Sequence, residues 1–190
     1  MSKIGKKPIE IPAGVEVKIN DGRISVKGPK GELTKPLMEG VNVIIDGNLV
    51  KVSPERDSGQ VSSSQRKAIS ARGRWGLQRA LIANIITGVT EGFEKTLEFQ
   101  GVGYKAIVKG NDLELGLGYS HPIIVPGVEG ITFSVEKNSI KISGPNKELV
   151  GQIAAEIKDK RPPEPYKGSG IRYKGEIIKR KAGKKAVAAG

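Results

Sequence analysis

The sequence predicts an α+β protein made of two duplicated small domains, each an antiparallel sheet covered on one face by one helix, with a basic C-terminal tail. Three observations support this prediction. Apolar residues alternate with polar ones around glycine-containing turns, apolar residues at helical spacing follow these strands, and two segments of the chain resemble each other. We predict domains over residues 1–88 and 89–161, and a basic C-terminal extension over 162–190.

The first half of the chain contains two predicted hairpins. Residues 15–27 alternate on both sides of Asp21-Gly22, and Gly28-Pro29 ends the second strand. Residues 41–52 repeat the pattern around a turn at Asp46-Gly47-Asn48. Together these segments predict an antiparallel sheet.

A helix follows this sheet. Ser62 and Gln65 have the spacing of a capping box, and Gly88 is a typical residue to follow the end of a helix. Gly73 and Gly76 weaken the helical pattern. The predicted buried stripe consists of Leu77, Ala80, Leu81 and Ile85.

After Gly88 the same order of elements begins again. Residues 93–117 predict strands with a turn at Gly110–Asp112, and residues 118–122 break the pattern. Residues 129–143 predict a further hairpin. The second helix is expected to begin near Asn146 and to end before Pro162, with a buried stripe of Leu149, Val150, Ile153 and Ile157.

The two halves match without a gap at a separation of 90 positions. Residues 39–53, EGVNVIIDGNLVKVS, and residues 129–143, EGITFSVEKNSIKIS, are identical at five of fifteen positions and similar at six more. Alternation explains the apolar matches but not the polar identities. A second register, residues 24–33 against 140–149, is also possible. We favour the first because a helix follows both of its segments.

The charge of the chain is concentrated at its C-terminal end. The 190 residues carry a net charge of +12, and residues 158–190 hold eleven Lys and Arg against three Asp and Glu. A surplus of this kind favours nucleic acid or an anionic membrane surface as partner. No apolar run is long enough to cross a bilayer, and the chain has no cysteine. We therefore expect a cytoplasmic protein.

No catalytic constellation is present in the sequence. With one histidine, His121, and no cysteine, the chain cannot form a multi-histidine metal site or a Cys-His pair. Gly101-x-Gly103 lacks the third glycine and the helix of a dinucleotide motif, and residues 28–31 lack the spacing of a phosphate loop. We expect neither an enzyme nor a bound cofactor or metal.

The basic tail predicts a phosphate-binding surface, because Lys and Arg neutralise phosphates and release counterions. Tyr166 and Tyr173 either stack on exposed bases or pack the tail onto the second domain. The run Lys179–Lys185 either becomes ordered on a polyanion, which we favour, or stays a disordered end. A second basic cluster on the first helix is either a binding surface or a solvated face; it contains Arg66, Lys67, Arg72, Arg74 and Arg79.

Several segments together resemble a known family, the bacterial form of ribosomal protein L-six of the large subunit. They run from one end of the chain to the other: GKKPIEIPAGVEV, VKGPKGEL, ANIITGVTEGFEKTLEFQGVGYKA, LGYSHP, ELVGQIAAEI and RPPEPYKGSGIRY. The resemblance implies two duplicated domains and binding to 23S rRNA, mainly through the second domain and the tail. It also implies a place near the translation-factor-binding region and the sarcin–ricin loop, at the base of the lateral stalk.

The chain departs from the family pattern at Ser169, where members usually carry a lysine, and its first helix is richer in arginine than the family's. The resemblance implies a structural rRNA-binding role, with neighbouring large-subunit proteins as partners and translation factors nearby. We expect tail folding to accompany binding, and Gly168 and Gly170 to permit close approach to the rRNA. The predicted rRNA-binding residues are Lys160, Arg161, Tyr166, Lys167, Gly168, Gly170, Arg172, Tyr173, Lys174, Lys179, Arg180, Lys181, Lys184 and Lys185.

Two other functions remain open at this point. Basic charge alone also fits a nonspecific DNA-binding or architectural protein, and an enzyme with an unfamiliar site is a third possibility. Competition between rRNA and duplex DNA distinguishes the rRNA-binding role from nonspecific DNA binding.

Overall fold

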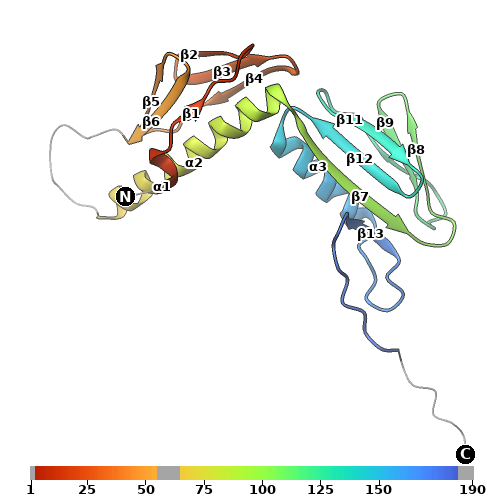
Figure 1. Cartoon of the computed structure of the whole chain (residues 1–190). Coiled ribbons are helices and arrows are strands. Elements are labelled where there is room, and N and C mark those ends of the chain that lie inside the picture. The colour runs from red at the N-terminus through yellow and green to blue at the C-terminus, as the bar shows by residue number, and fades with distance from the viewer. Residues whose placement is uncertain (1–2, 55–64, 184–190) are drawn as a thin grey trace, which may run out of the picture. The chain divides into compact units, whose positions relative to one another are not determined.

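The protein is described by a computed structural model that covers residues 3–54 and 65–183, with side chains for residues 4–54 and 73–183 (Figure 1). The chain divides into two compact units. The first comprises Met1–Gly92 with Pro145–Lys147, and the second comprises Phe93–Gly144 with Glu148–Gly190. Both units combine antiparallel strands with a long helix, so the predicted α+β class is confirmed.

The strands of the first unit form two three-stranded antiparallel sheets, with the orders β1-β6-β5 and β2-β3-β4. The prediction of one sheet per domain was therefore too simple. The elements are α1 (Lys3–Lys6), β1 (Ile9–Glu10), β2 (Glu16–Asn20), β3 (Arg23–Gly28), β4 (Gly31–Pro36), β5 (Val41–Asp46), β6 (Leu49–Pro54) and α2 (Gln65–Thr90).

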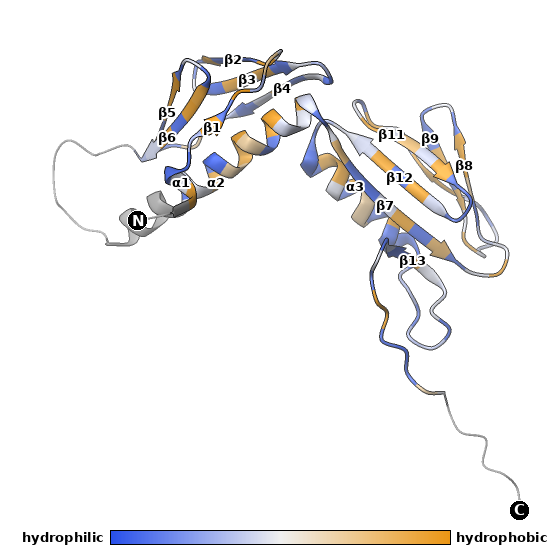
Figure 2. Cartoon of the chain, viewed as in Figure 1, coloured by the Kyte–Doolittle hydropathy of each residue, from blue (hydrophilic) through white to orange (hydrophobic). Residues whose placement is uncertain are grey.

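Helix α2 packs against strands of both sheets, and its apolar residues alternate with polar ones along the ribbon in Figure 2. Its buried face differs from the predicted stripe: Leu77 is half exposed, and only Ile85 of the four predicted residues is buried. Apolar residues occur on several faces of this helix, so their periodicity alone did not select one. The side chains that α2 buries are Trp75, Gln78, Ile82, Ile85, Ile86 and Val89.

Two polar groups on this face have partners within the unit. The indole Nε1 of Trp75 donates to the Val52 carbonyl oxygen at 2.7 Å. Gln78 is buried, and its Oε1 accepts the Met38 amide at 3.2 Å. Hydrogen bonding of this kind removes most of the cost of burying a polar group.

The C-terminus of α2 lies beyond the predicted position. Gly88 is inside the helix, and Gly92 follows its end with a φ of 79°. The Gly92 amide donates to the Thr87 carbonyl oxygen at 3.2 Å, which closes the last turn. The Ser62 half of the predicted capping box lies outside the described residues.

The second unit repeats this arrangement and adds a strand. Its sheets have the orders β10-β9-β8 and β11-β12-β7-β13, all antiparallel. The elements are β7 (Phe93–Gln100), β8 (Lys105–Lys109), β9 (Asp112–Gly116), β10 (Ile123–Val125), β11 (Thr132–Glu136), β12 (Ser139–Gly144), α3 (Lys147–Lys160) and β13 (Gly170–Tyr173).

Helix α3 has the predicted buried face. Val150, Ile153 and Ile157 are buried, and Leu149 packs against the same core partly exposed. The helix begins one residue after Asn146 and ends at Lys160, before Pro162, as predicted. The apolar residues of α3 recur at helical spacing on one face only, so the sequence predicted the buried face correctly.

Besides the two-residue β1 and the tail strand β13, the sequence prediction missed β4 and β10. Each is the third strand of a sheet: β4 pairs with β3, and β10 pairs with β9. Strand β4 contains one apolar side chain, Leu33, and ends in a proline, whereas β10 has only three residues. Neither shows the alternation that identifies a half-buried strand.

The duplication is confirmed in the register predicted first. Strands β6 and β12 are 90 positions apart at both ends. In the first unit the Ile11 amide donates to the Asn48 carbonyl at 2.8 Å, and in the second the Phe99 amide donates to the Asn138 carbonyl at 3.0 Å. The predicted domain limits at residues 88 and 161 stay a prediction, because compactness does not show that either part folds alone.

Exchanging a glycine inside α2 and the glycine that follows its end for alanine should have opposite effects. G92A should destabilise the protein by about 1 kcal/mol, because its positive φ disfavours a Cβ. G73A should stabilise it by about 0.5–1 kcal/mol, because Gly73 is exposed inside the helix and a Cβ there meets no atom within 4 Å. Urea unfolding of both variants measures the two differences, and equal signs would contradict the assigned helix end.

Candidate nucleic-acid interface

The C-terminal segment is built into the second unit. Strand β13 pairs with β7 through Gly170↔Gln100 and Ile171↔Phe99, and Ile171 is 0% exposed. The described part of the tail therefore adds a strand to the sheet of the second unit. The expectation that tail folding accompanies binding stays a prediction. The amide of Ile171 returns to the carbonyl oxygen of Arg161 at 2.8 Å.

A compact loop over residues 162–169 connects α3 to β13. The Glu164 amide donates to the Ser169 carbonyl at 2.8 Å, and the Gly168 amide donates to the Glu164 carbonyl at 3.0 Å. The hydroxyl of Ser169, where the family pattern has lysine, donates to Glu164 Oε2 at 3.2 Å. Further along, the Lys181 amide donates to the Pro165 carbonyl at 2.9 Å, so Lys181 lies beside this loop.

The two glycines predicted to approach rRNA are also required by the loop itself. Gly170 has a φ of 136°, and a Cβ there would lie 2.6 Å from the Pro162 oxygen. Gly168 has a φ of 74°, and a Cβ would lie 3.2 Å from the guanidinium of Arg180. Both residues are buried. The positive φ at both positions, together with the Pro162 backbone at Gly170, explains why glycine occupies them.

Arg161 joins the end of α3 to two tyrosines of the second unit. Its Nε donates to the Tyr104 hydroxyl at 3.1 Å, and its guanidinium lies 4.9 Å from the centroid of the Tyr119 ring. The Tyr119 hydroxyl donates to the Lys160 carbonyl at 3.1 Å. The hydrogen bonds that Arg161 donates to the hydroxyls of Tyr119 and Tyr104 raise its pKa. The charge predicted to meet a phosphate is thus used to position the start of the loop.

Arg172 and Glu98 form a pair across β13 and β7. Glu98 Oε2 accepts Arg172 Nη2 at 3.1 Å and Arg172 Nε at 3.2 Å, and both side chains are about a third exposed. A pair at this exposure contributes modestly to stability. Its main consequence is that much of the Arg172 charge is compensated within the protein.

Tyr173 packs against the domain, which was one of the two roles considered for it. The ammonium of Lys158 lies 4.7 Å from its ring centroid and that of Lys95 lies 5.8 Å away. Glu176 accepts the Tyr173 amide at 2.9 Å and pairs with Lys158 at 2.7 Å. The hydrogen bond from Lys158, followed by that from Tyr173, lowers the pKa of Glu176.

The remaining cations of the predicted site are exposed. Of the predicted aromatic side chains, Tyr166 stays 55% exposed and is free to stack. The hydrogen bond from Lys181 to Pro165 and the contact of Arg180 with Gly168 bring the end of the tail to the loop that carries Tyr166 and Lys167. Lys184 and Lys185 lie outside the described residues. We call the following exposed set the tail cations: Lys160, Lys167, Lys174, Lys179, Arg180 and Lys181.

The second basic cluster is described only in part. The side chains of Arg66, Lys67 and Arg72 lie outside the described set, and Arg74 is exposed. Arg79 donates from Nε to the Lys7 carbonyl at 3.2 Å, which fastens the N-terminal segment to α2. This contact gives Arg79 a structural role that the sequence did not indicate.

The described residues contain no group of three His, Asp or Glu side chains placed to hold a metal ion. No helix in residues 3–54 and 65–183 combines the length and the apolar character needed to cross a membrane. His121 is exposed in the segment before β10. The candidate interface therefore consists of the tail cations and Tyr166.

Comparison with known proteins gives one family. The family described as Ribosomal protein L6 matches residues 11–92 and 100–174. Three similar proteins carry the name large ribosomal subunit protein uL6. That of Persephonella marina is 54% identical over 185 residues, 97% of this chain and 98% of its own. That of Nitratiruptor sp. is 54% identical over 188 residues (98% and 99%), and that of Salinispora arenicola 51% over 187 (97% and 98%).

Truncating Ile171 should destabilise the second unit. I171A should cost about 2–5 kcal/mol, because it removes most of a side chain buried between β7 and the core. I177A is the matched control: Ile177 belongs to the same segment but is 90% exposed, and it should cost less than about 0.5 kcal/mol. Equal unfolding free energies for the two variants would contradict the packing of the tail.

Glu176 should contribute stability that depends on pH. Its pKa is lowered in the folded state, so the contribution is present above the ordinary value of 4.5 and is lost as the pH falls through the folded value. E176Q should be less stable than the parent at pH 7, by at most about 1 kcal/mol at this exposure, and the difference should shrink as the pH falls below 4.5. E129Q, which alters an exposed carboxylate elsewhere in the unit, should show no such pH-dependent difference in urea unfolding.

Proposed function

Because the chain belongs to the ribosomal protein L6 family, we propose that it binds 23S rRNA through the tail cations and Tyr166 on its second unit. Membership makes the chain a structural protein of the large ribosomal subunit, located in the ribosome in the cytoplasm, and not an enzyme. The sequence predicted each of these properties. The finer statement, that 23S rRNA is the ligand and the tail its binding surface, is the proposal.

The observation that carries this proposal is the division of the basic residues into two groups. Arg161, Arg172 and Lys158 each contact a tyrosine or a carboxylate within the unit. The tail cations are exposed, and the structure shows no ion pair for them among the described residues. Phosphates of RNA compensate such charges, with release of counterions. The contacts of Arg161, Arg172 and Lys158 position the backbone that carries the tail cations.

The surface also has the composition of an RNA-binding site. Exposed lysines and an arginine lie near the exposed ring of Tyr166, which suits stacking on an unpaired base. Backbone hydrogen bonds hold residues 162–173 in a loop and a strand, and a segment held in this way loses less conformational entropy when it binds a ligand. Contacts that position the protein on phosphates need no base-specific groups.

We also propose that the bound protein lies near the translation-factor-binding region, with other large-subunit proteins as neighbours. Resemblance to the family supports this position. A rigid second unit that carries its own RNA-binding loop would support the packing of the rRNA there.

Removing three of the tail cations should weaken rRNA binding and reduce its dependence on salt. In K179Q/R180Q/K181Q the slope of log K against log salt should fall by about 2–3, at 0.7–0.9 per phosphate contact. The backbone bond from Lys181 to Pro165 does not depend on the side chain, so the fold should be retained. Binding to a 23S rRNA transcript across a salt series measures the slope.

The matched control is K6Q/K7Q/K27Q, which removes the same charge from exposed positions of the first unit and should change the slope less. Duplex DNA serves as competitor. Equal competition by duplex DNA at moderate salt would favour the nonspecific DNA-binding alternative, and an unchanged slope in the tail variant would contradict the proposed surface.

A further inference from the structure

The β11–β12 hairpin contains a lysine in a backbone conformation that favours glycine. Lys137 has a φ of 49°, and the matching residue of the first unit, 90 positions earlier, is Gly47 with a φ of 57°. Among the described residues, only Asp21 and Lys137 combine a positive φ with a side chain. Aspartate tolerates this region, whereas lysine gains nothing from it locally. A strained residue where a duplicate has glycine indicates a function for its side chain.

Lys137 stands at one end of an open groove in the second unit. A first hollow of about 770 Å³ and a second of about 560 Å³ share Phe99, Gln100 and Asn138. The first extends to Lys137 and Arg172, and the second extends to Lys167 and Ser169 of the 162–169 loop. We call this continuous surface the β7 groove, because residues of β7 line both parts. It connects the hairpin turn to the loop that carries Tyr166.

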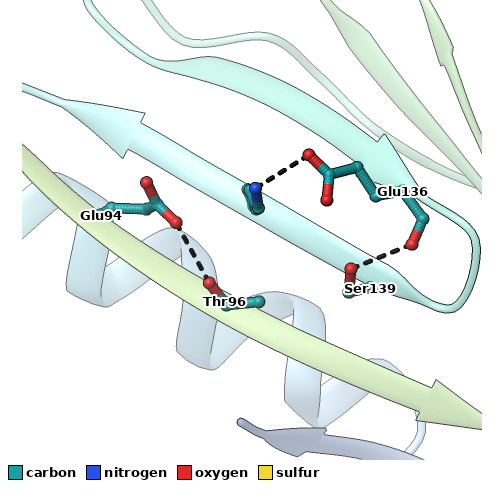
Figure 3. A network of polar contacts seen from close by, with 5 residues as sticks. Glu94, Thr96, Glu136 and Ser139 are labelled. Atoms are coloured by element: carbon teal, nitrogen blue, oxygen red, sulfur yellow. Dashed lines mark hydrogen bonds and ion pairs between the residues drawn. The ribbon is translucent and has the colours of Figure 1, made fainter.

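The acidic residues of the groove are already paired. Glu136 Oε1 pairs with Lys141 Nζ at 2.8 Å, and Figure 3 shows the Glu136 carboxylate turned toward the neighbouring strand. The Ser139 hydroxyl donates to the Glu136 carbonyl at 2.9 Å in the same view. Glu98 is paired with Arg172. Lys137 and Lys167 have no ion pair among the described residues, so the groove presents uncompensated positive charge at both ends.

The rest of the groove offers contacts that suit bases and sugars. Gln100 and Asn138 supply amide groups, which both donate and accept hydrogen bonds. Val102 is 100% exposed on a loop between two glycines, so its side chain is free to pack against the face of a base. An acidic peptide would use the two cations, but it would leave this combination of amides and an exposed apolar side chain without a clear partner.

We propose that the β7 groove binds a single-stranded segment of RNA, with one phosphate at Lys137 and another at Lys167. This inference rests on the proposed function and adds a second contact region to it. The groove extends the tail surface across β7 to the β11–β12 turn. It also gives the lysine at position 137 a role that offsets its unfavourable backbone conformation.

Replacing Lys137 by the glycine of the first unit separates stability from binding. K137G should fold with an unfolding midpoint no lower than that of the parent, because glycine fits the turn. It should nevertheless bind a 23S rRNA transcript severalfold more weakly, with a salt slope smaller by about 0.7. K27Q, which removes the same charge from the first unit, is the control and should keep the parent slope.

K179Q, measured in parallel, distinguishes failure of this inference from failure of the proposed function. A weakened K179Q with an unaffected K137G would overturn the groove and leave the tail surface intact. Failure of the parent protein to bind the transcript would overturn the proposed function itself. An equal loss in K27Q and K137G would assign the effect to net charge and overturn the groove.

Crosslinking identifies the occupant directly. The chain has no cysteine, so a K137C variant carries a photoreactive group at one position only. In assembled large subunits this group should crosslink to rRNA, whereas the same group in a K27C variant should not give the same crosslink. A crosslink from position 137 to a protein alone would show that the groove holds a protein partner, and would overturn the RNA proposal.

Discussion

The pairing of β13 with β7 is the constraint on which the rest of the second unit depends. Without β13, β7 would be the edge of its sheet, and its unpaired backbone groups would face solvent. Pairing places Ile171 in the core and holds Gly170 against Pro162, which closes the 162–169 loop. The positions of Lys167, Arg180 and Lys181 follow from this closure. The basic surface is thus a consequence of a strand being added to the sheet.

The two units share a hydrogen bond at a matching hairpin turn, and they differ in the length of the strand beside that turn. In each, a hairpin turn accepts a backbone hydrogen bond from the strand beside it, at Asn48 and at Asn138. In the first unit that strand is β1, with two residues, whereas in the second it is β7, with eight. The longer strand has room to pair with β13 as well as β12. The second unit therefore carries the basic extension beside β7, and its matching hairpin turn has Lys137 where the first unit has Gly47.

A high net charge does not by itself identify the residues that bind a polyanion. Arg161 and Arg172 belong to the basic tail, yet one is held by tyrosines and the other by Glu98. Such contacts position the loop and leave the exposed lysines to neutralise phosphates. Lys137 is the opposite case. It lies outside the tail, and its positive φ distinguishes it from the other lysines among the described residues.

Local patterns in the sequence determined the class of fold, the duplication and its register, the face of α3 and the family. These features repeat or alternate over short distances, so neighbouring residues reveal them. The face of α2, its end at Gly92, the strands β4 and β10, and the folding of the tail were decided by tertiary structure. Most of them depend on residues far apart in the chain, as when Ile171 of the tail pairs with Phe99. The helix end is a local feature, but the sequence offers two nearby glycines, and only the structure shows that Gly92 adopts the positive φ after the last turn. Electrostatic roles followed the same division, because only the folded chain shows that Arg172 pairs with Glu98, whereas Lys167 has no ion pair among the described residues.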